Sequence, residues 1–263
     1  MKDISGKVAI VTGSGTGVGA ATARLLASQG CHVVINYSRS AEAAEKVARE
    51  CEALGVQTLT CRANVADDTD CRAMVDRALS KWGHVDILVN NAGTTKFCDH
   101  RHLEGLSSDD FLSIYGVNVV GPFQMIRAVA KAMQSQPEGG VVVNVASTAA
   151  VTGIGSSVAY AASKGALVTM TLSLARALGP EIRINAVCPG FIQGDWLREG
   201  LGDEQYEAAK SHNERNAPLG VTACPDTVAD AILHFITGPQ IITGETLMVD
   251  GGRHLNSVPL GRR

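Results

Sequence analysis

The sequence predicts an α/β fold in which a doubly wound parallel sheet carries helices on both faces. Strand-like apolar runs alternate with helical patterns along the whole chain, which is the order that parallel strands with crossover helices require. A length of 263 residues is normal for one such sheet, and 45% hydrophobic residues suffice for a sizeable core. Repeats, low-complexity stretches and a Pro/Ser-rich linker are absent, so we expect residues 1–263 to form a single domain.

The individual elements follow from periodicity. The expected strands are short apolar runs at residues 8–11, 33–36, 57–61, 86–89, 141–145, 182–187 and 246–249. The expected helices occupy residues 20–28, 41–54, 70–82, 110–133, 159–178 and 226–236. Residues 191–216 mix aromatic and aliphatic side chains with charges, which is typical of a mobile substrate lid. The alternative is that Trp196 and Tyr206 of this segment pack against a neighbouring subunit.

A glycine-rich loop stands between the first strand and the first helix. Residues 12–19 read Thr-Gly-Ser-Gly-Thr-Gly-Val-Gly. Glycines let the backbone approach a pyrophosphate, and the free N–H groups at a helix start stabilise its charge. Because strand and helix flank the loop correctly, a dinucleotide-binding loop is favoured over a flexible loop without function.

A candidate catalytic set lies near the middle of the chain. Tyr160 and Lys164 are four residues apart on a predicted helix and therefore share one face. A nearby ammonium favours the phenolate, so we expect Lys164 to lower the pKa of Tyr160 from its usual value near ~10 and to allow proton exchange at neutral pH. Ser147 follows the run 141–145 and is expected to hold a substrate oxygen beside the phenol. Such Tyr–Lys pairs also occur on solvated helices, so the assignment depends on the other motifs.

Several further motifs stand along the chain in order. They are residues 12–19, Asn90–Asn91–Ala92–Gly93, Asn118, Ser147, Tyr160, Lys164, Pro189–Gly190 and the glycine-bounded run 244–252. From about residue 6 to residue 252 the chain resembles the short-chain dehydrogenase/reductase family, in its small single-domain branch. The 3-oxoacyl-[acyl-carrier-protein] reductases are similar members. The resemblance implies a Rossmann-like sheet of seven strands.

It also implies hydride transfer between a nicotinamide cofactor and a carbonyl or secondary alcohol carbon. Tyr160 is then the general acid in reduction, Lys164 lowers its pKa and bonds the nicotinamide ribose, and Ser147 orients the substrate oxygen. Asn118 is expected to bind a water that links Lys164 to solvent. The implied cofactor contacts are Gly13, Ser14, Thr16, Gly17, Val18, Gly19, Asn36, Tyr37, Ser38, Arg39, Asn64, Val65, Asn91, Ala92, Gly93, Tyr160, Lys164, Pro189, Gly190 and Ile192.

The end of the second strand favours NADP(H) over NAD(H). NAD-specific members have an acidic residue there that bonds the ribose hydroxyls, whereas this chain has Asn36 followed by Tyr37 and Ser38. Arg39, together with Ser38 and Ser40, is available for a 2′-phosphate. The less favoured alternative is that Arg39 is a solvated surface arginine. Against NADP(H), the glycine loop lacks the basic residue that many NADP-preferring relatives carry.

Two positions depart from the family pattern. Asn64–Val65 stands where relatives often have Asp-Val beside the adenine, and an Asn amide still accepts a bond from the adenine amino group. Gly194 stands where many relatives have a Thr that bonds the nicotinamide carboxamide. The backbone N–H of Ile192 is the expected substitute.

Composition argues against several other classes. A net charge of −3 and a pI near 6.2 provide no basic field for nucleic acid or an anionic membrane. No uninterrupted apolar run reaches the ~18 residues of a membrane span, and the N-terminus lacks an apolar signal region. Seven scattered cysteines fit free thiols in the cytoplasm. His100 and His102 have poor spacing for a metal site, so we expect no catalytic metal.

The sequence leaves substrate and mechanism class partly open. Lys96 and Arg101 lie near the expected pocket mouth, but two charges are too few to indicate an acidic carrier protein. Acyl thioesters, steroids, sugars and small ketones all remain possible substrates. A cofactor-binding regulator without turnover and an enzyme for dehydration or epimerisation are the alternatives. The intact Ser147–Tyr160–Lys164 set favours simple redox chemistry.

We expect a homotetramer, with a dimer as the fallback. One sheet covers only one face of each helix, whereas two predicted helices carry apolar or small residues on further faces. The tail 253–263 is expected to add contacts. The helix residues concerned are Val119, Val120, Ile126, Val129, Ala161, Ala162, Ala166, Val168 and Leu172.

Overall fold

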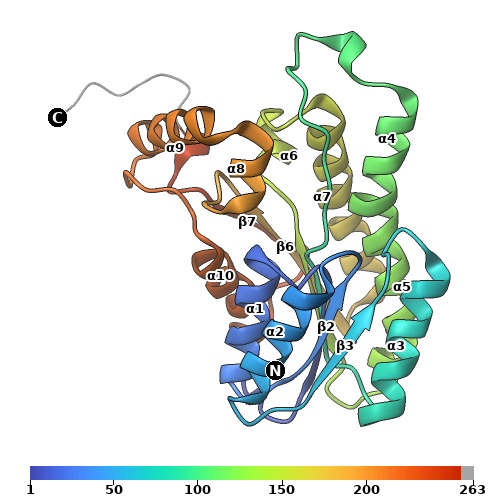
Figure 1. Cartoon of the computed structure of the whole chain (residues 1–263). Helices are drawn as coiled ribbons and strands as arrows, with labels where there is room; N and C mark the ends of the chain where they lie inside the picture. The colour runs from blue at the N-terminus through green and yellow to red at the C-terminus, as the bar shows by residue number, and fades with distance from the viewer. Residues whose placement is uncertain (256–263) are drawn as a thin grey trace.

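Seven parallel strands form one sheet in a computed structural model that describes residues 1–255. Their order across the sheet is β3-β2-β1-β4-β5-β6-β7, as the predicted fold class requires (Figure 1). Residues 256–263, most of the tail expected to add subunit contacts, lie outside the described residues. The strands are β1 (Val8–Val11), β2 (His32–Tyr37), β3 (Thr58–Arg62), β4 (Ile87–Asn90), β5 (Gly140–Val145), β6 (Ile182–Pro189) and β7 (Thr246–Val249).

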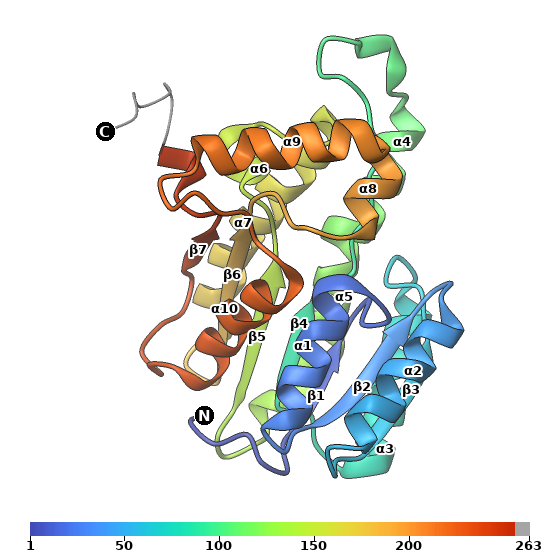
Figure 2. The ribbon, with the colours of Figure 1, turned by 60° about the vertical axis from the view of Figure 1, so that its left-hand side comes forward.

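Helices cover both faces of the sheet (Figures 1 and 2). Helices α1, α2 and α10 pack on one face, and α3, α5 and α7 pack on the other. Figure 2 shows α8 and α9 above the carboxyl edge of the sheet. The helices are α1 (Gly17–Ser28), α2 (Ala41–Glu52), α3 (Asp68–Trp82), α4 (Ser108–Tyr115), α5 (Gly121–Gln134), α6 (Ala149–Thr152), α7 (Val158–Leu178), α8 (Asp195–Leu201), α9 (Asp203–Asn216) and α10 (Pro225–Thr237), with the short turns η1 (Leu103–Gly105), η2 (Gly116–Val120) and η3 (Arg253–Leu255).

Each expected strand forms within two residues of its expected bounds. The helices differ more. The segment 110–133, expected as one helix, is divided into α4, the π-helical turn η2 and α5. The expected lid segment contains two helices, α8 and α9, and α6 is a further helix that periodicity did not indicate because it has only four residues.

Helix α7 is the longest helix of the described chain and is rich in apolar residues. It is 21 residues long with a mean hydropathy of 1.2, which is enough by length and composition to cross a membrane. Within the structure, however, it lies against β6, α4 and α6 and buries polar residues, including Ser163, Lys164 and Thr171. Contacts within the fold therefore account for part of its apolar character.

The strand order places a crevice at one point of the sheet. Strands β1 and β4 are neighbours, and the chain leaves β1 toward β2 on one side and β4 toward β5 on the other. Ligands of open α/β sheets bind at the carboxyl ends of the strands, at such a switch point. The glycine loop follows β1, and Asn91–Gly93 follows β4, so both predicted motifs meet there.

Candidate active site

The glycine loop forms an anion cradle at the start of α1. Gly13 and Gly17 have φ angles of +63° and +54°, which favour glycine. A Cβ on Gly19 would lie 2.3 Å from the Gly13 carbonyl oxygen, so only glycine fits there. Across the described residues, no side chain caps α1 at Thr16, whereas Asp67 caps α3 and Ser157 caps α7. The first N–H groups of α1 therefore remain available to a phosphate, and the loop fits a dinucleotide.

Two side chains hold this loop in shape. Asn91 donates from Nδ2 to the carbonyl oxygens of Thr12 (2.9 Å) and Gly13 (3.0 Å), which ties the end of β4 to the loop. The Thr12 hydroxyl accepts from the backbone N–H groups of Asn91 and Ala92, both at 3.0 Å. The Thr12 side chain thus links the glycine loop to the segment after β4. Thr12 belongs to the sequence motif, but its spacing there does not indicate this role.

Asn36 is used inside the protein. It is buried, its Oδ1 accepts from the Gly13 N–H at 3.0 Å, and its Nδ2 donates to the Ala63 carbonyl at 3.1 Å. Ser14 is buried as well and donates to the Val11 carbonyl at 2.7 Å. Both were expected to contact a cofactor, and in the structure their side chains shape the loop.

The exposed end of β2 and β3 carries two arginines. Ser38 and Arg39 are exposed after β2, and Arg62 at the end of β3 pairs in register with Tyr37. Paired residues of neighbouring parallel strands share a face of the sheet. Neither arginine has a side-chain partner among residues 1–255. Sequence reasoning missed Arg62, because only the register shows that it stands beside the residues that follow β2.

Asn64 and Val65 continue from β3. Asn64 is exposed, and its Oδ1 accepts from the Ala66 N–H at 3.2 Å. Val65 is buried against Gly121 of the helix start, and its carbonyl oxygen accepts from Gln124 at 2.8 Å. Asn64 thus lies at the surface after the carboxyl end of β3, while Val65 fixes this strand end to α5.

Ser147, Tyr160 and Lys164 come together at the carboxyl end of β5. Ser147 follows β5, and its hydroxyl lies close enough to the Tyr160 phenol to lower the phenol pKa. Tyr160 and Lys164 share one face of α7, with the Lys164 Nζ 5.7 Å from the centre of the phenol ring. Lys164 is buried and donates from Nζ to the Val145 carbonyl at 2.8 Å. A phenol, a hydroxyl and a lysine amine therefore share one site.

The ionisation of this set differs from the sequence prediction. Burial raises the pKa of Tyr160 to about 12, and the hydrogen bond with Ser147 offsets only part of that rise. Burial also lowers the pKa of Lys164 to about 8. The predicted direction of the phenol pKa is wrong for this structure, because burial of the phenol raises its pKa and Lys164 is not among the groups that lower it. The phenol is protonated at neutral pH.

Asn118 sits in the π-helical turn η2, a feature frequent at functional sites. Its Oδ1 accepts from the Thr94 N–H at 2.8 Å, and its Nδ2 donates to the Thr94 carbonyl and the Ser163 hydroxyl, both at 3.0 Å. A Cβ on Gly93 would lie 3.5 Å from the Asn118 Oδ1 and 3.7 Å from the Lys164 Nζ. Gly93 therefore leaves space beside Lys164, and the Asn118 side chain fixes the walls of that space.

Pro189 and Gly190 close the site beside Ser147. The Thr148 N–H donates to the Pro189 carbonyl at 2.9 Å. A Cβ on Gly190 would lie 2.6 Å from the Asp250 Cβ, so the turn needs glycine. Ile192 pairs with Ala223 in an isolated bridge, and in the described part of the chain its own N–H has no backbone acceptor. It is thus free for the carboxamide contact that Gly194 cannot make through a side chain.

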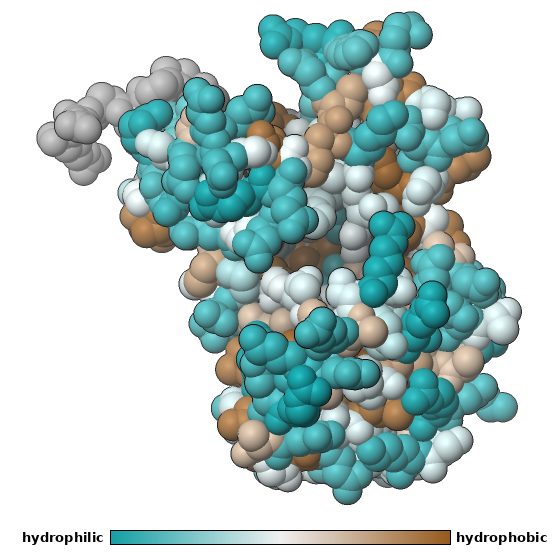
Figure 3. Space-filling view, viewed as in Figure 1, coloured by the Kyte–Doolittle hydropathy of each residue, from teal (hydrophilic) through white to brown (hydrophobic). Residues whose placement is uncertain are grey.

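Aromatic rings from α8 and a loop lie beside the phenol. The Trp196 ring centre is 6.3 Å from that of Tyr160 and 5.8 Å from that of Phe97. Tyr206 is buried within its own chain against Phe191, and its hydroxyl accepts from the Gly194 N–H at 3.1 Å. The alternative that Tyr206 packs against a neighbouring subunit is therefore wrong. Figure 3 shows the surface hollowed between the α8–α9 segment and the part of the molecule below it.

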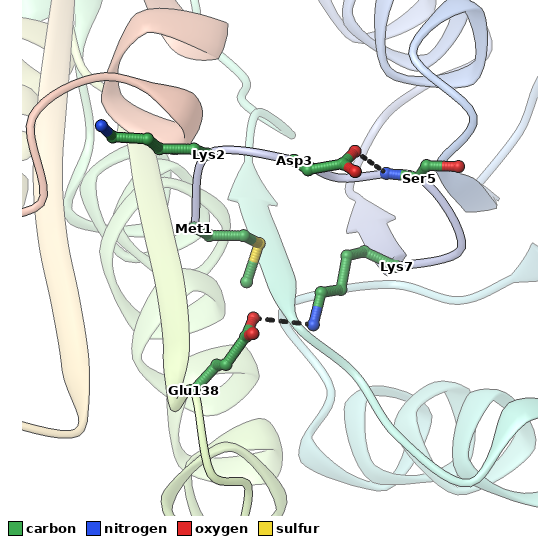
Figure 4. A pocket seen from close by; sticks show the side chains of 6 residues that line it. All are labelled: Met1, Lys2, Asp3, Ser5, Lys7 and Glu138. Atoms are coloured by element: carbon green, nitrogen blue, oxygen red, sulfur yellow. Dashed lines mark hydrogen bonds and ion pairs between the residues drawn. The ribbon is translucent and has the colours of Figure 1, made fainter.

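A separate hollow lies at the opposite edge of the sheet. It has a volume of about 500 Å³ and is lined by N-terminal residues together with Lys7 and Glu138, which form an ion pair at 2.9 Å (Figure 4). Lys7 precedes β1 and Glu138 precedes β5, so the hollow is at the amino ends of the strands, away from Tyr160. His100 is likewise outside any cluster of metal ligands within residues 1–255 and bonds the Gly155 carbonyl at 3.1 Å.

A family model described as "Enoyl-(Acyl carrier protein) reductase" matches residues 13–254, which is most of the chain. The chain belongs to the short-chain dehydrogenase/reductase family. Its members among the similar proteins are dehydrogenases and reductases, so this chain is an NAD(P)-dependent oxidoreductase that acts on a carbonyl or alcohol group.

Three proteins similar to this short-chain dehydrogenase/reductase have different named activities. The chain is 38% identical to a protein named as ketoacyl reductase 2 of the granaticin polyketide synthase of Streptomyces violaceoruber, over 94% of this chain and 96% of that one. It is 34% identical to a 3-oxoacyl-[acyl-carrier-protein] reductase of Synechocystis, over 96% and 98%. A solved 7α-hydroxysteroid dehydrogenase in complex with NADH and 7-oxo glycochenodeoxycholic acid has a TM-score of 0.85 at 33% identity, covering 95% of this chain and 94% of that one.

Proposed function

We propose that this protein is an NADP(H)-dependent reductase of a ketone, with 3-oxoacyl thioesters among the candidate substrates. The observation that carries the proposal is the meeting of Ser147, Tyr160 and Lys164 at the same sheet edge as the uncapped glycine loop. A cofactor held by its pyrophosphate at α1 would extend across β4 toward Lys164. When bound, the nicotinamide supplies the hydride.

The protein residues supply the proton and the orientation. Tyr160, with a pKa of about 12, stays protonated at neutral pH, which is the form that a general acid needs in reduction. Ser147 orients the substrate oxygen toward the phenol and stabilises the charge that develops on it. Lys164 supplies a positive charge near the phenol and a donor for the cofactor ribose, and Asn118 holds the space beside it for a water relay.

NADP(H) is proposed over NAD(H) because of the charge at the ends of β2 and β3. Two exposed guanidinium groups, Arg39 and Arg62, have no carboxylate partner within the described chain. No acidic residue stands between Asn36 and Ser40 to repel a 2′-phosphate. Arginine binds phosphate oxygens through two parallel N–H bonds, which suits this position.

Arg39→Ala is expected to weaken NADPH binding selectively, by about 1–3 kcal/mol for a lost charge-assisted contact. Arg62→Ala should act in the same direction, while NADH binding changes little in both variants. Titration calorimetry of the purified protein with each cofactor measures the effect, and Arg49→Ala, an exposed arginine in the last turn of α2, is the matched control. Equal or tighter binding of NADH by the parent protein would refute the preference.

The segment 191–216 is proposed to act as the substrate lid of a single catalytic domain. Arg198 ties α8 to α9 through ion pairs with Asp203 (2.7 Å) and Glu207 (2.8 Å), so that the two helices form one unit. This unit stands at the carboxyl edge of the sheet and brings Trp196 to the phenol. A lid there would exclude water from the site.

A homotetramer is proposed from the apolar side chains that the fold leaves exposed. Leu112, Val120 and Phe123 lie exposed along α4, η2 and α5, and Leu172 lies exposed on α7. Ile126 and Val129, which were expected to contribute, are buried inside their own chain and cannot. Strand β7 is an edge strand with Leu247 exposed, a second surface that another subunit can cover.

Light scattering at micromolar concentration is expected to give the mass of four chains. Phe123→Asp should reduce the assembled mass, because a carboxylate would be buried in the subunit contact. Lys131→Ala on an exposed part of α5 should leave it unchanged. A monomeric parent protein would contradict both the tetramer and the dimer.

The regulator without turnover is the second function to test. It shares the cofactor cradle, so cofactor binding does not separate the two functions. An assay of NADPH oxidation with a panel of ketones and β-ketoacyl thioesters separates them, because only an enzyme oxidises NADPH when a ketone is supplied. The cytoplasm is the proposed location, and the seven free thiols support a reducing compartment.

A further inference from the structure

Three aromatic rings from separate segments meet at the proton donor. Tyr160 comes from α7, Trp196 from α8, and Phe97 from the loop after β4. The rings are tilted against one another, by 44° between Tyr160 and Trp196 and by 51° between Phe97 and Trp196. Trp196 is 49% exposed, so a large apolar surface next to the phenol is left uncovered by its own chain.

The packing around these rings shows that their placement is specific. A Cβ on Gly200, one turn after Trp196, would lie only 2.1 Å from Phe97 Cε2, so α8 approaches the Phe97 ring as closely as the backbone allows. Helix α8 is in turn fastened by Arg198, which lies 4.1 Å over the Tyr206 ring in addition to its two ion pairs. The position of Trp196 therefore does not depend on its own contacts alone.

The loop that carries Phe97 is fixed to the segment before α7. The Cys98 N–H donates to the Ser156 carbonyl at 2.9 Å, and the Thr95 and Ser156 hydroxyls are 2.7 Å apart. A Cβ on Gly155 would lie 3.2 Å from the Tyr160 ring, so this segment packs directly on the phenol. Both sides of the aromatic cluster are thus anchored.

Among residues 1–255, the lysine and the arginine of the loop that carries Phe97 are both paired, and an exposed apolar side chain stands in the segment that packs on Tyr160. Ile154 is 72% exposed beside Gly155. The two cations of the Phe97 loop are engaged: Lys96 donates to Asp110 at 2.8 Å, and Arg101 pairs with Asp99 at 3.2 Å. A substrate with a phosphate, a carboxylate or a chain of hydroxyl groups would find few partners here, whereas a flat apolar group would cover exposed rings.

We propose that Trp196 and Phe97 form an aromatic wall that selects ketones with a planar ring next to the carbonyl group, an inference that rests on the proposed reductase function. A carbonyl oxygen bonded to the Tyr160 hydroxyl places its substituents within reach of an indole centred 6.3 Å from the phenol ring. An aryl or fused-ring substituent stacks on that surface. A saturated ring of the same size fills the space without the stacking contact.

Steady-state reduction of 1-tetralone and of its saturated analogue 1-decalone tests the proposal. The parent should show a higher kcat/KM for tetralone. Trp196→Ala should lower that value roughly tenfold and change the decalone value less than about threefold, since only tetralone loses an aromatic stacking contact. Trp196→Phe should retain most of the preference, and Trp82→Phe, which replaces the tryptophan stacked on His32, should leave both values unchanged. An equal fall in kcat/KM for both ketones in Trp196→Ala would refute the proposed aromatic wall.

Calorimetry of ketone binding tests the aromatic wall independently of the proposed reductase function. With oxidised cofactor present, a ketone cannot be reduced, so its affinity reports the pocket alone. Tetralone should bind the parent about tenfold more tightly than it binds Trp196→Ala, and decalone should bind both alike. If neither ketone is reduced but this difference is found, the reductase assignment fails and the wall stands. If tetralone binds both proteins alike, or Trp196→Phe loses as much as Trp196→Ala, the wall is refuted.

Discussion

Tyr160→Phe is expected to lower kcat for ketone reduction by about two to four orders of magnitude, the usual contribution of a general acid. The change removes one hydroxyl and keeps the ring that packs against Trp196 and Gly155. The fold and the affinity for NADPH should therefore change little. Steady-state kinetics with the best ketone, together with calorimetry of NADPH binding, measure both effects.

Two variants accompany this experiment. Ser147→Ala should also lose turnover while it retains NADPH, because its hydroxyl bonds the phenol and not the cofactor loop. Tyr115→Phe, which removes a hydroxyl at the end of α4, is the matched control and should leave kcat unchanged. Reduction by Tyr160→Phe at close to the parent rate would end the proposed role of the phenol.

Lys164→Ala is expected to reduce both kcat and NADPH affinity. Removal of a charged donor in a dry site costs about 10²–10³ in kcat, and loss of a charged hydrogen bond to the ribose costs about 1.5–3 kcal/mol of binding. Because burial lowers the pKa of Lys164 to about 8, its charge is present below that pH and is lost above it. The rate of reduction should therefore fall as the pH rises through about 8, and this limb should be absent in Lys164→Ala.

An exposed lysine provides the control. Lys131→Ala on α5 should leave the rate, the affinity and the pH profile unchanged. Undiminished NADPH affinity in Lys164→Ala would show that the lysine acts on the phenol alone. A pH profile that keeps its limb in that variant would assign the titration to another group.

The sheet was predictable because buried parallel strands read as continuous apolar runs. The strands β1, β4 and β5 are buried over their whole length, and their only polar side chains are Asn90 and Asn144, near the carboxyl ends of β4 and β5. The cradle was predictable as well, because a positive φ at Gly13 and a close contact at Gly19 both require glycine. These are constraints that act on single residues, and they are visible in the sequence.

Other parts of the site depend on contacts between distant segments. The pKa of Tyr160 is set by desolvation, which spacing on a helix does not report, and so the expected direction was wrong. The Asn118 side chain, in the π-helical turn, is held by bonds to Thr94 and Ser163 from two other segments. Arg62 is placed by the register of β3 against β2, and the aromatic wall by the approach of α8 to Phe97.

The most direct test of the central claim follows a deuterium atom. NADPH labelled with deuterium at C4, in each of its two stereochemical forms, is incubated with the parent protein and the ketone that it reduces best. One of the two forms should deliver the label to the carbinol carbon of the product alcohol, detected by mass spectrometry, and Tyr160→Phe should deliver it at a rate about two to four orders of magnitude lower. Product alcohol without the label from either form, or no alcohol from any ketone or β-ketoacyl thioester, would contradict hydride transfer by this site.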